Sequence, residues 1–168
     1  FSNCYIKIIH GYGGQQVIFV DKDHPEKTLD FAEQFKHVIA QEFLPNISLG
    51  DKRVLTVGNK IVGALRRTPK TGSILANMCQ GGSASICSLT PKEEEICQKL
   101  VKWCEKHGIM FSGIDLIDER LIEVNITCPT GYKVIDNLNP ELNLPEIIPT
   151  PLKTINNAKF RQKLALSA

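Results

Sequence analysis

Three oxygen-bearing side chains in two neighbouring β-type segments are the strongest candidates for chemistry in this 168-residue sequence. Asp115 lies in the segment 109–117, and Glu123 and Asn125 lie two residues apart in the segment 121–126. Residues two apart share one face of a strand, and pairing of the two segments as a hairpin would bring Asp115 to that face. Hard oxygen ligands of this kind suit Mg²⁺ held jointly with phosphates. The alternative is a solvated outer face of an edge hairpin.

A glycine-dense turn follows the first strand-like segment and its lysine, Lys7. Gly11, Gly13 and Gly14 in this turn would let backbone N–H groups approach phosphate oxygens, and Lys7 would add a positive charge. The pattern matches neither the Walker sequence nor the dinucleotide-binding GxGxxG sequence. Its alternative interpretation is a flexible hairpin turn with a surface lysine.

Arginines gather at the ends of two further strand-like segments. Arg66 and Arg67 end one of them, and Arg53 lies near the start of the other. Guanidinium groups that converge there could bind a phosphate or a carboxylate through paired hydrogen bonds. By themselves, such residues are more often exposed to solvent.

Composition narrows the class of protein. The net charge of +2 does not favour nucleic acid as a partner, and no apolar run reaches the roughly 18 residues of a membrane span. The six cysteines contain no CxxC pair, so we expect reduced thiols of a cytoplasmic protein rather than structural zinc or disulfides. Cys97, Cys104, Trp103 and Phe111 are expected in the core. The sequence begins at Phe1 directly before a strand-like run, which predicts that part of the working protein lies upstream.

Hydrophobic patterning predicts an α+β fold with mostly antiparallel sheets and flanking helices. Strands are expected at 4–9, 16–20, 37–43, 51–57, 60–67, 109–117 and 121–126, and helices at 27–36 and 91–107. Thr90 is the predicted N-cap of the second helix, with Glu93 completing a capping box, and Gly108 ends it. The segment 68–85 is predicted to be a long loop, and regular periodicity fades after Asn137.

Four stretches, taken in order, resemble the ATP-grasp carboxylate–amine ligases, and most closely the bacterial-type glutathione synthetases. They are 6–14 (IKIIHGYGG), 40–55 (AQEFLPNISLGDKRVL), 64–82 and 113–131 (GIDLIDERLIEVNITCPTG). The resemblance implies the C-terminal portion of the ATP-grasp fold. Its implied parts are the end of the lid subdomain with the glycine loop at 1–43, the C-terminal subdomain with the metal and phosphate site at 44–145, and a tail or short helix at 146–168.

The resemblance also implies a role for each candidate residue. ATP would contact residues of the lid, of the hinge strand and of the ribose side, namely Lys7, Gly11, Gly13, Gly14, Gln41, Glu42, Phe43, Leu44 and Asp51. Mg²⁺ or Mn²⁺ would be held by Asp115, Glu123 and Asn125. The catalytic arginines would be Arg67, on the transferred phosphoryl group, and Arg53, on a substrate carboxylate. Further substrate contacts would come from Asn125, Cys128 and Thr130.

The implied reaction is ATP-dependent formation of a peptide bond, from γ-glutamylcysteine and glycine to glutathione, ADP and phosphate through an acyl phosphate. We expect small peptide and amino-acid substrates, a homo-oligomer and a cytoplasmic location, with neither nucleic acid nor membrane as partner. Two alternatives stay open: a protein or peptide glutamate ligase of the same superfamily, and a catalytically incomplete ATP-binding module. The sequence departs from the family pattern in having Cys128 in place of serine and Ile74 or Leu75 in place of an arginine.

Overall fold

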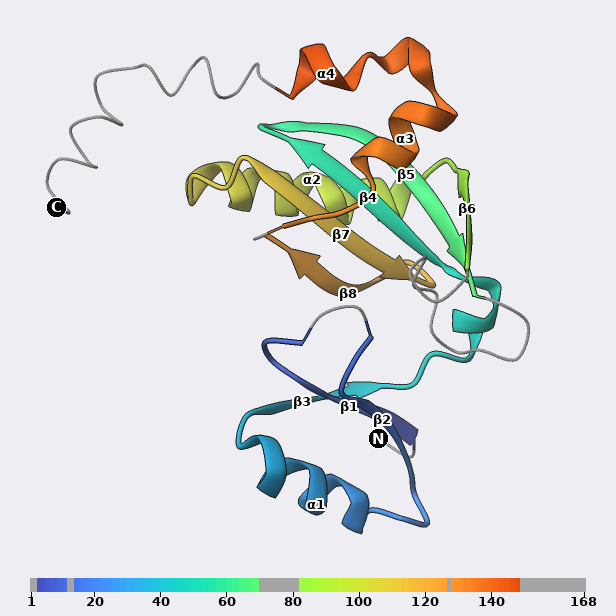
Figure 1. Ribbon diagram of the computed structural model, residues 1–168, viewed down its shortest axis with the longest axis vertical. Coiled ribbons are helices and arrows are strands. Elements are labelled where there is room, and N and C mark those ends of the chain that lie inside the picture. Colours follow the sequence, from blue (N-terminus) through green and yellow to red (C-terminus); the bar gives the residue numbers. More distant parts are fainter. Residues whose placement is uncertain (1–2, 12–13, 70–81, 127, 149–168) are drawn as a thin grey trace, which may run out of the picture. The chain divides into compact units, whose positions relative to one another are not determined.

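The computed structural model describes residues 3–11, 14–69, 82–126 and 128–148. It has the α+β architecture of mostly antiparallel sheets and helices that the patterning predicts (Figure 1). The described residues fall into two compact units. One contains the residues up to 49 together with 68–69 and 82–83, and the other contains 50–67 together with 84–148.

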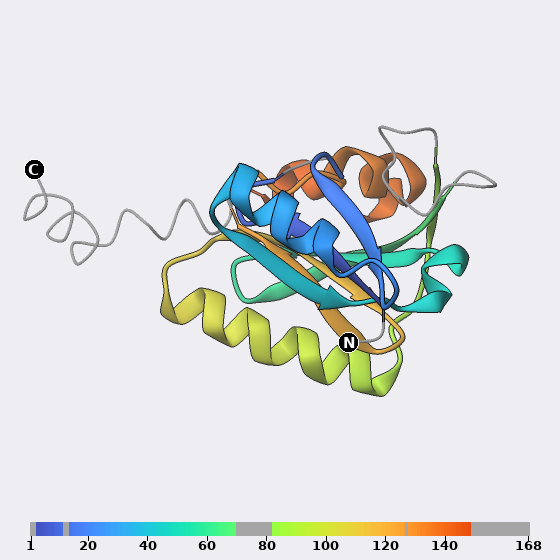
Figure 2. The ribbon, with the colours of Figure 1, turned by 90° about the horizontal axis from the view of Figure 1, so that it is seen from below.

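The first unit is a three-stranded sheet with one helix. Its elements are β1 (Asn3–Ile8), β2 (Val17–Asp21), α1 (Glu26–Phe35) and β3 (Val38–Glu42), with the strands in the spatial order β2-β1-β3. β1 pairs antiparallel with both neighbours. Ile6 and Val20 of the sheet are buried against Phe31 of α1, which lies across that face (Figure 2). A 3₁₀ helix, Pro45–Leu49, follows β3.

The second unit is a five-stranded sheet with helices on both faces. Its strands have the spatial order β6-β5-β4-β7-β8 and are β4 (Asp51–Val57), β5 (Lys60–Thr68), β6 (Ser83–Ile86), β7 (Phe111–Ile117) and β8 (Arg120–Asn125). Its helices are α2 (Pro91–Lys106), α3 (Tyr132–Leu138), a 3₁₀ turn at Pro140–Leu142 and α4 (Leu144–Ile147).

The middle strand, β4, is buried along its whole length. On one face Val54 packs in a cluster with Cys97 of α2. On the other face Leu55 and Leu65 pack with Ile135 of α3. Because both faces are closed to water, every charged side chain of β4 needs a partner inside the protein.

Local capping explains where α2 begins and ends. Thr90 accepts a hydrogen bond from the backbone N–H of Glu93 at 3.3 Å, and the Glu93 carboxylate accepts one from the Thr90 N–H at 2.8 Å. This is the predicted capping box, with Pro91 in the first turn. Gly108 follows the helix with φ +70°, the left-handed conformation that favours glycine.

The prediction that Trp103 lies in the core is wrong. Its side chain is 48% exposed on the surface of α2, where its ring stacks on His107 at a centroid distance of 4.1 Å. The buried residues of α2 include Cys97, Val101 and Cys104, which follow one helical stripe to which Trp103 does not belong. The expected burial of Cys97 and Cys104 is therefore confirmed.

Two further differences concern short elements. β6 lies partly inside the segment 68–85, which was expected to be a loop, and residues 70–81 of that segment, with Ile74 and Leu75, lie outside the described residues. The short helices α3 and α4 were not expected, because one or two turns give too little periodicity to detect.

The five cysteines in the described ranges, including Cys97 and Cys128, are free thiols. Burial raises the pKa of Cys97 to about 12, so this thiol stays protonated near neutral pH. Among the described residues, none of the helices has both the length and the apolar character to cross a membrane.

Replacing Thr90 by alanine should lower the free energy of unfolding by about 1 kcal/mol, the typical value of an N-cap. The substitution also removes the hydroxyl that donates to Glu119 at 2.7 Å. Urea unfolding checks this, with Thr90→Ser as the control that keeps both hydrogen bonds. Equal stability of Thr90→Ala and the wild type would contradict the role of the cap.

Candidate functional site

Two arginines and two aspartates meet on one face of the five-stranded sheet. Asp51 and Arg53 are two residues apart on β4 and therefore point to the same side. Arg67 of β5 is the register partner of Asp51, and Asp115 of β7 is the register partner of Arg53. The pairing of three strands thus brings four charged residues together that are up to 64 positions apart in the sequence.

These four side chains form a row of ion pairs in which positive and negative groups alternate. Both carboxylate oxygens of Asp51 accept from Arg67, whose Nε donates at 2.8 Å and whose Nη2 makes the second bond. Arg67 Nη2 also lies 3.1 Å from Asp115 Oδ2. Arg53 donates from Nε to Asp115 Oδ1 and from Nη2 to Oδ2 at 2.7 Å. We call these four residues the charge cluster.

Burial sets the electrostatics of the charge cluster. The four residues are 4–7% exposed. Burial raises the pKa of the Asp51 carboxyl, and the hydrogen bonds and charge of Arg67 oppose that rise. Burial alone would lower the pKa of Arg67, but its hydrogen bond to Asp51 and the charge of Asp115 outweigh this and raise the pKa. Arg67 is therefore positively charged at any physiological pH.

The predicted metal ligands lie on the same side of the sheet as the charge cluster. Asp115 of β7 and Glu123 of β8 are direct register partners. Asn125, two residues after Glu123, is the register partner of Gly113. The three oxygen-bearing side chains thus share a face, as the sequence predicts. Asp115 is buried, whereas Glu123 lies exposed on the edge strand.

The amide of Asn125 connects these groups. With its oxygen turned to Arg53, it accepts from Nη2 at 3.3 Å and its nitrogen donates to Glu123 Oε1 at 3.0 Å. In the other orientation its nitrogen lies 3.4 Å from Asp115 Oδ2. Asn125 therefore bridges the exposed carboxylate to the buried charge cluster.

The donor set fits a hard divalent cation. Two carboxylates and an amide oxygen are the ligand types that Mg²⁺ prefers. Three carboxylates, those of Asp51, Asp115 and Glu123, stand against two guanidinium groups, so one negative charge is left in excess. Within the described ranges, no three His, Cys, Asp or Glu residues group as a metal site by themselves. A cation here would therefore need the amide and further oxygens, such as those of phosphates.

The turn before α3 reaches the charge cluster through its backbone. The carbonyl oxygen of Thr130 accepts from Arg53 Nη1 at 3.1 Å. Cys128, at the start of the same turn, is exposed. The implied substrate roles of Thr130 and Cys128 stay predictions, whereas the bond from Arg53 to the Thr130 carbonyl is a contact that the sequence did not reveal.

A second buried ion pair lies on the opposite face of β4. Lys52 donates to Glu93 Oε2 at 2.5 Å and to the carbonyl oxygen of Ser88 at 3.0 Å. Arg66 pairs in register with Lys52 and so lies on that face, away from Arg67. Sequence reasoning missed this ion pair, although Glu93 was recognised as part of the capping box.

In the first unit, two of the residues that the resemblance assigns to ATP share a sheet face. Lys7 alternates with residues that pack on α1, so it lies on the opposite face. Gln41 lies there too, as the register partner of Tyr5. Tyr5, Phe19 and Phe43 form three edge-to-face ring pairs, with centroids 5.3–5.7 Å apart.

The remaining residues of the first unit lie in the turn and beyond β3. Gly14 has φ +73° in the turn, and a Cβ on Gly11 would lie 3.0 Å from Ile8 Cγ1. Gly13 lies outside the described residues. Glu42 ends β3, and Leu44, shortly after it, is buried.

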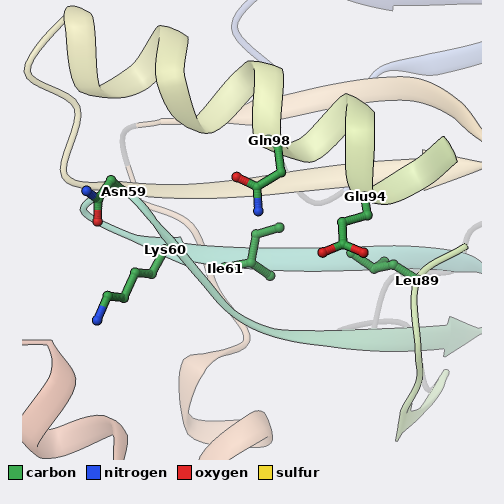
Figure 3. Close-up of a pocket in the computed structure, with 6 residues that line it drawn as sticks. All are labelled: Asn59, Lys60, Ile61, Leu89, Glu94 and Gln98. Atoms are coloured by element: carbon green, nitrogen blue, oxygen red, sulfur yellow. The ribbon is translucent and has the colours of Figure 1, made fainter. Parts of the chain in front are cut away.

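A hollow elsewhere on the second unit contains none of the predicted site residues. It is lined by Asn59, Lys60, Ile61, Leu89, Glu94 and Gln98, between the β4–β5 turn and α2 (Figure 3).

Comparison with known proteins identifies the family. Residues 1–140 match the prokaryotic glutathione synthetase ATP-grasp domain. The chain belongs to this family. It is 37% identical over 139 residues to the glutathione synthetase of Prochlorococcus marinus subsp. pastoris, a match over 80% of this chain and 45% of that protein. It is 37% identical over 137 residues to the enzyme of Rhodopseudomonas palustris, covering 79% and 44%. The chain thus spans about half the length of these relatives.

Solved structures confirm the ATP-grasp fold. D-cycloserine synthetase DcsG has a TM-score of 0.66 at 11% identity, over 87% of this chain and 56% of that one. D-alanine–D-alanine ligase from Bacillus anthracis, complexed with ATP, has a TM-score of 0.60 at 15% identity, over 90% and 53%.

Replacing Arg67 by methionine should lower the free energy of unfolding by roughly 3–5 kcal/mol, because it leaves the buried Asp51 carboxylate without its guanidinium. The double variant Asp51→Leu/Arg67→Met should recover most of this loss, since an apolar pair needs no charge compensation. The loss in Arg67→Met should become smaller as the pH is lowered, because burial raises the pKa of the Asp51 carboxyl and the neutral carboxyl tolerates burial. Urea unfolding of both variants checks this, and a double variant no more stable than Arg67→Met would contradict it.

Proposed function

We propose that this chain carries the Mg²⁺- and ATP-binding part of a ligase that joins γ-glutamylcysteine to glycine and forms glutathione, ADP and phosphate. Membership of the prokaryotic glutathione synthetase family supports this proposal. The main observation in its favour is that Asp115, Glu123 and Asn125 lie on one face of the five-stranded sheet, beside two buried arginines. Oxygen ligands and fixed positive charges together are what transfer of a phosphoryl group requires.

The proposed chemistry activates a carboxylate. ATP phosphorylates the carboxylate of the first substrate to an acyl phosphate, the amine of the second substrate attacks, and phosphate leaves. Bound Mg²⁺ would neutralise charge on the transferring phosphoryl group. Glu123, Asn125 and Asp115 would hold the cation. Arg67 would add a positive charge, because its guanidinium stays protonated at physiological pH. No nucleophile of the protein is required.

The first unit would supply the contacts to the nucleotide. Lys7 and the glycine turn at 11–14 would approach the phosphates, and residues 41–44 would contact the adenine. Asp51, in the second unit, would act near the ribose or substrate side.

We propose the same three parts as the family resemblance implies, at 1–43, 44–145 and 146–168. The family resemblance also supports small peptide and amino-acid substrates, a homo-oligomer and a cytoplasmic location.

The test is formation of product by the full-length native protein supplied with γ-glutamylcysteine, glycine, ATP and Mg²⁺. Mass spectrometry should find glutathione in step with released phosphate. Glu123→Gln should lower kcat by about tenfold or more, since it removes a charged ligand. Glu105→Gln, an exposed glutamate of α2, is the matched control and should not change turnover.

Three outcomes would contradict the proposal. Addition of glutamate to a peptide would indicate the alternative ligase of the superfamily. Mg²⁺-dependent binding of ATP without phosphate release would indicate an incomplete ATP-binding module. Unchanged Mg²⁺ dependence in Glu123→Gln would remove the metal assignment.

A further inference from the structure

The side chain of Arg53 lies in a slot that exists because one strand residue has no side chain. A Cβ built on Gly113 of β7 would lie 3.1 Å from Arg53 Cδ and 3.3 Å from its Nη1. The same Cβ would lie 3.2 Å from Pro129 Cβ. These distances are shorter than ordinary van der Waals contacts. Gly113 and Pro129 are therefore walls of a slot that the arginine fills.

The turn before α3 closes this slot. Gly131 has φ +117°, a backbone conformation that favours glycine. A Cβ there would lie 3.8 Å from Arg53 Cγ and 3.3 Å from Leu55 Cδ1. The turn thus approaches the arginine stem closely, and it places the Thr130 carbonyl oxygen 3.1 Å from Nη1.

Tyr132, the next residue, anchors the turn to the sheet. Its hydroxyl donates to the carbonyl oxygen of Thr56 at 2.7 Å, and its ring packs edge-to-face on Phe111 with centroids 6.3 Å apart. Ile135, one turn further along α3, is 1% exposed in the core. The residues that directly follow the Thr130 carbonyl are therefore held in place by the sheet and the core.

We propose that Gly113, the Thr130 carbonyl and Gly131 form a socket that fixes Arg53 against Asp115, and that Arg53 is a positioning residue. Its Nε and Nη2 donate to Asp115 and its Nη1 donates to Thr130, so its hydrogen bonds point into the protein. This differs from the expectation that Arg53 binds a substrate carboxylate. Arg53 instead orients the Asp115 carboxylate next to Glu123. Its importance for catalysis rests on the proposed function of the same site.

The socket can be tested by NMR of the nucleotide-free protein with ¹⁵N-labelled arginine. Arg53 and Arg67 should each give a slowly exchanging Nε–H signal, because both Nε groups donate to buried carboxylates. Arg53→Lys assigns the first signal. Gly113→Ala should shift or abolish the Arg53 signal and leave that of Arg67 in place.

Gly108→Ala is the control for Gly113→Ala. It adds a methyl group just after α2, where a Cβ would meet nothing within 4 Å, and alanine is disfavoured there only by the φ of +70°. It should lower stability and leave the Arg53 signal unchanged. Tyr132→Phe is a milder second variant, which keeps the ring and should speed hydrogen exchange at Arg53 Nε more than at Arg67 Nε.

The proposal is overturned if the Arg53 signal keeps its shift and exchange rate in both Gly113→Ala and Tyr132→Phe. It is also overturned if Gly108→Ala changes that signal as much as Gly113→Ala does. These readouts need neither ATP nor Mg²⁺. A protein that shows the expected arginine signals but forms no glutathione would therefore support the socket and contradict the proposed function.

Discussion

The strand β4 imposes the main physical constraint on the second unit, because it is the middle strand of the sheet and carries charged side chains on both faces. A buried charge is tolerated only where an opposite charge and hydrogen bonds compensate for lost water. Arg53 obtains this compensation from Asp115 of β7, and Lys52 obtains it from Glu93 of α2. Each partner comes from an element distant in the sequence. The ion pairs therefore tie together the parts of the chain that surround β4.

This constraint also specifies the strand register. A slip of one residue would turn Arg53 toward the apolar cluster beneath α2 and Val54 toward the charge cluster. The glycine at position 113 and the turn at 128–131 then shape the space around the arginine. Buried ion pairs contribute little net stability when an apolar pair could replace them. The ion pairs of β4 therefore fix where its charged side chains lie more than they add stability.

Much of this arrangement could be predicted from local patterns, and some could not. The two-residue spacing of Glu123 and Asn125 was enough to place them on one face, and Thr90 was enough to place the start of α2. The contact between Arg53 and Asp115 depends on the register of two strands 62 residues apart, which no local period encodes. Trp103 was misplaced because its apolar character was given more weight than its position on the helix. α3 is only seven residues long and left no periodic signal.

The decisive experiment measures whether a divalent cation binds beside the charge cluster. Mn²⁺ with ADP would be added to protein labelled at arginine and tryptophan, and paramagnetic broadening of the side-chain N–H signals would be measured. A cation bound there should broaden the Arg53 and Arg67 Nε–H signals, with little change at the indole of Trp103 on the outer surface of α2. Broadening of the Trp103 signal with unchanged arginine signals would contradict it.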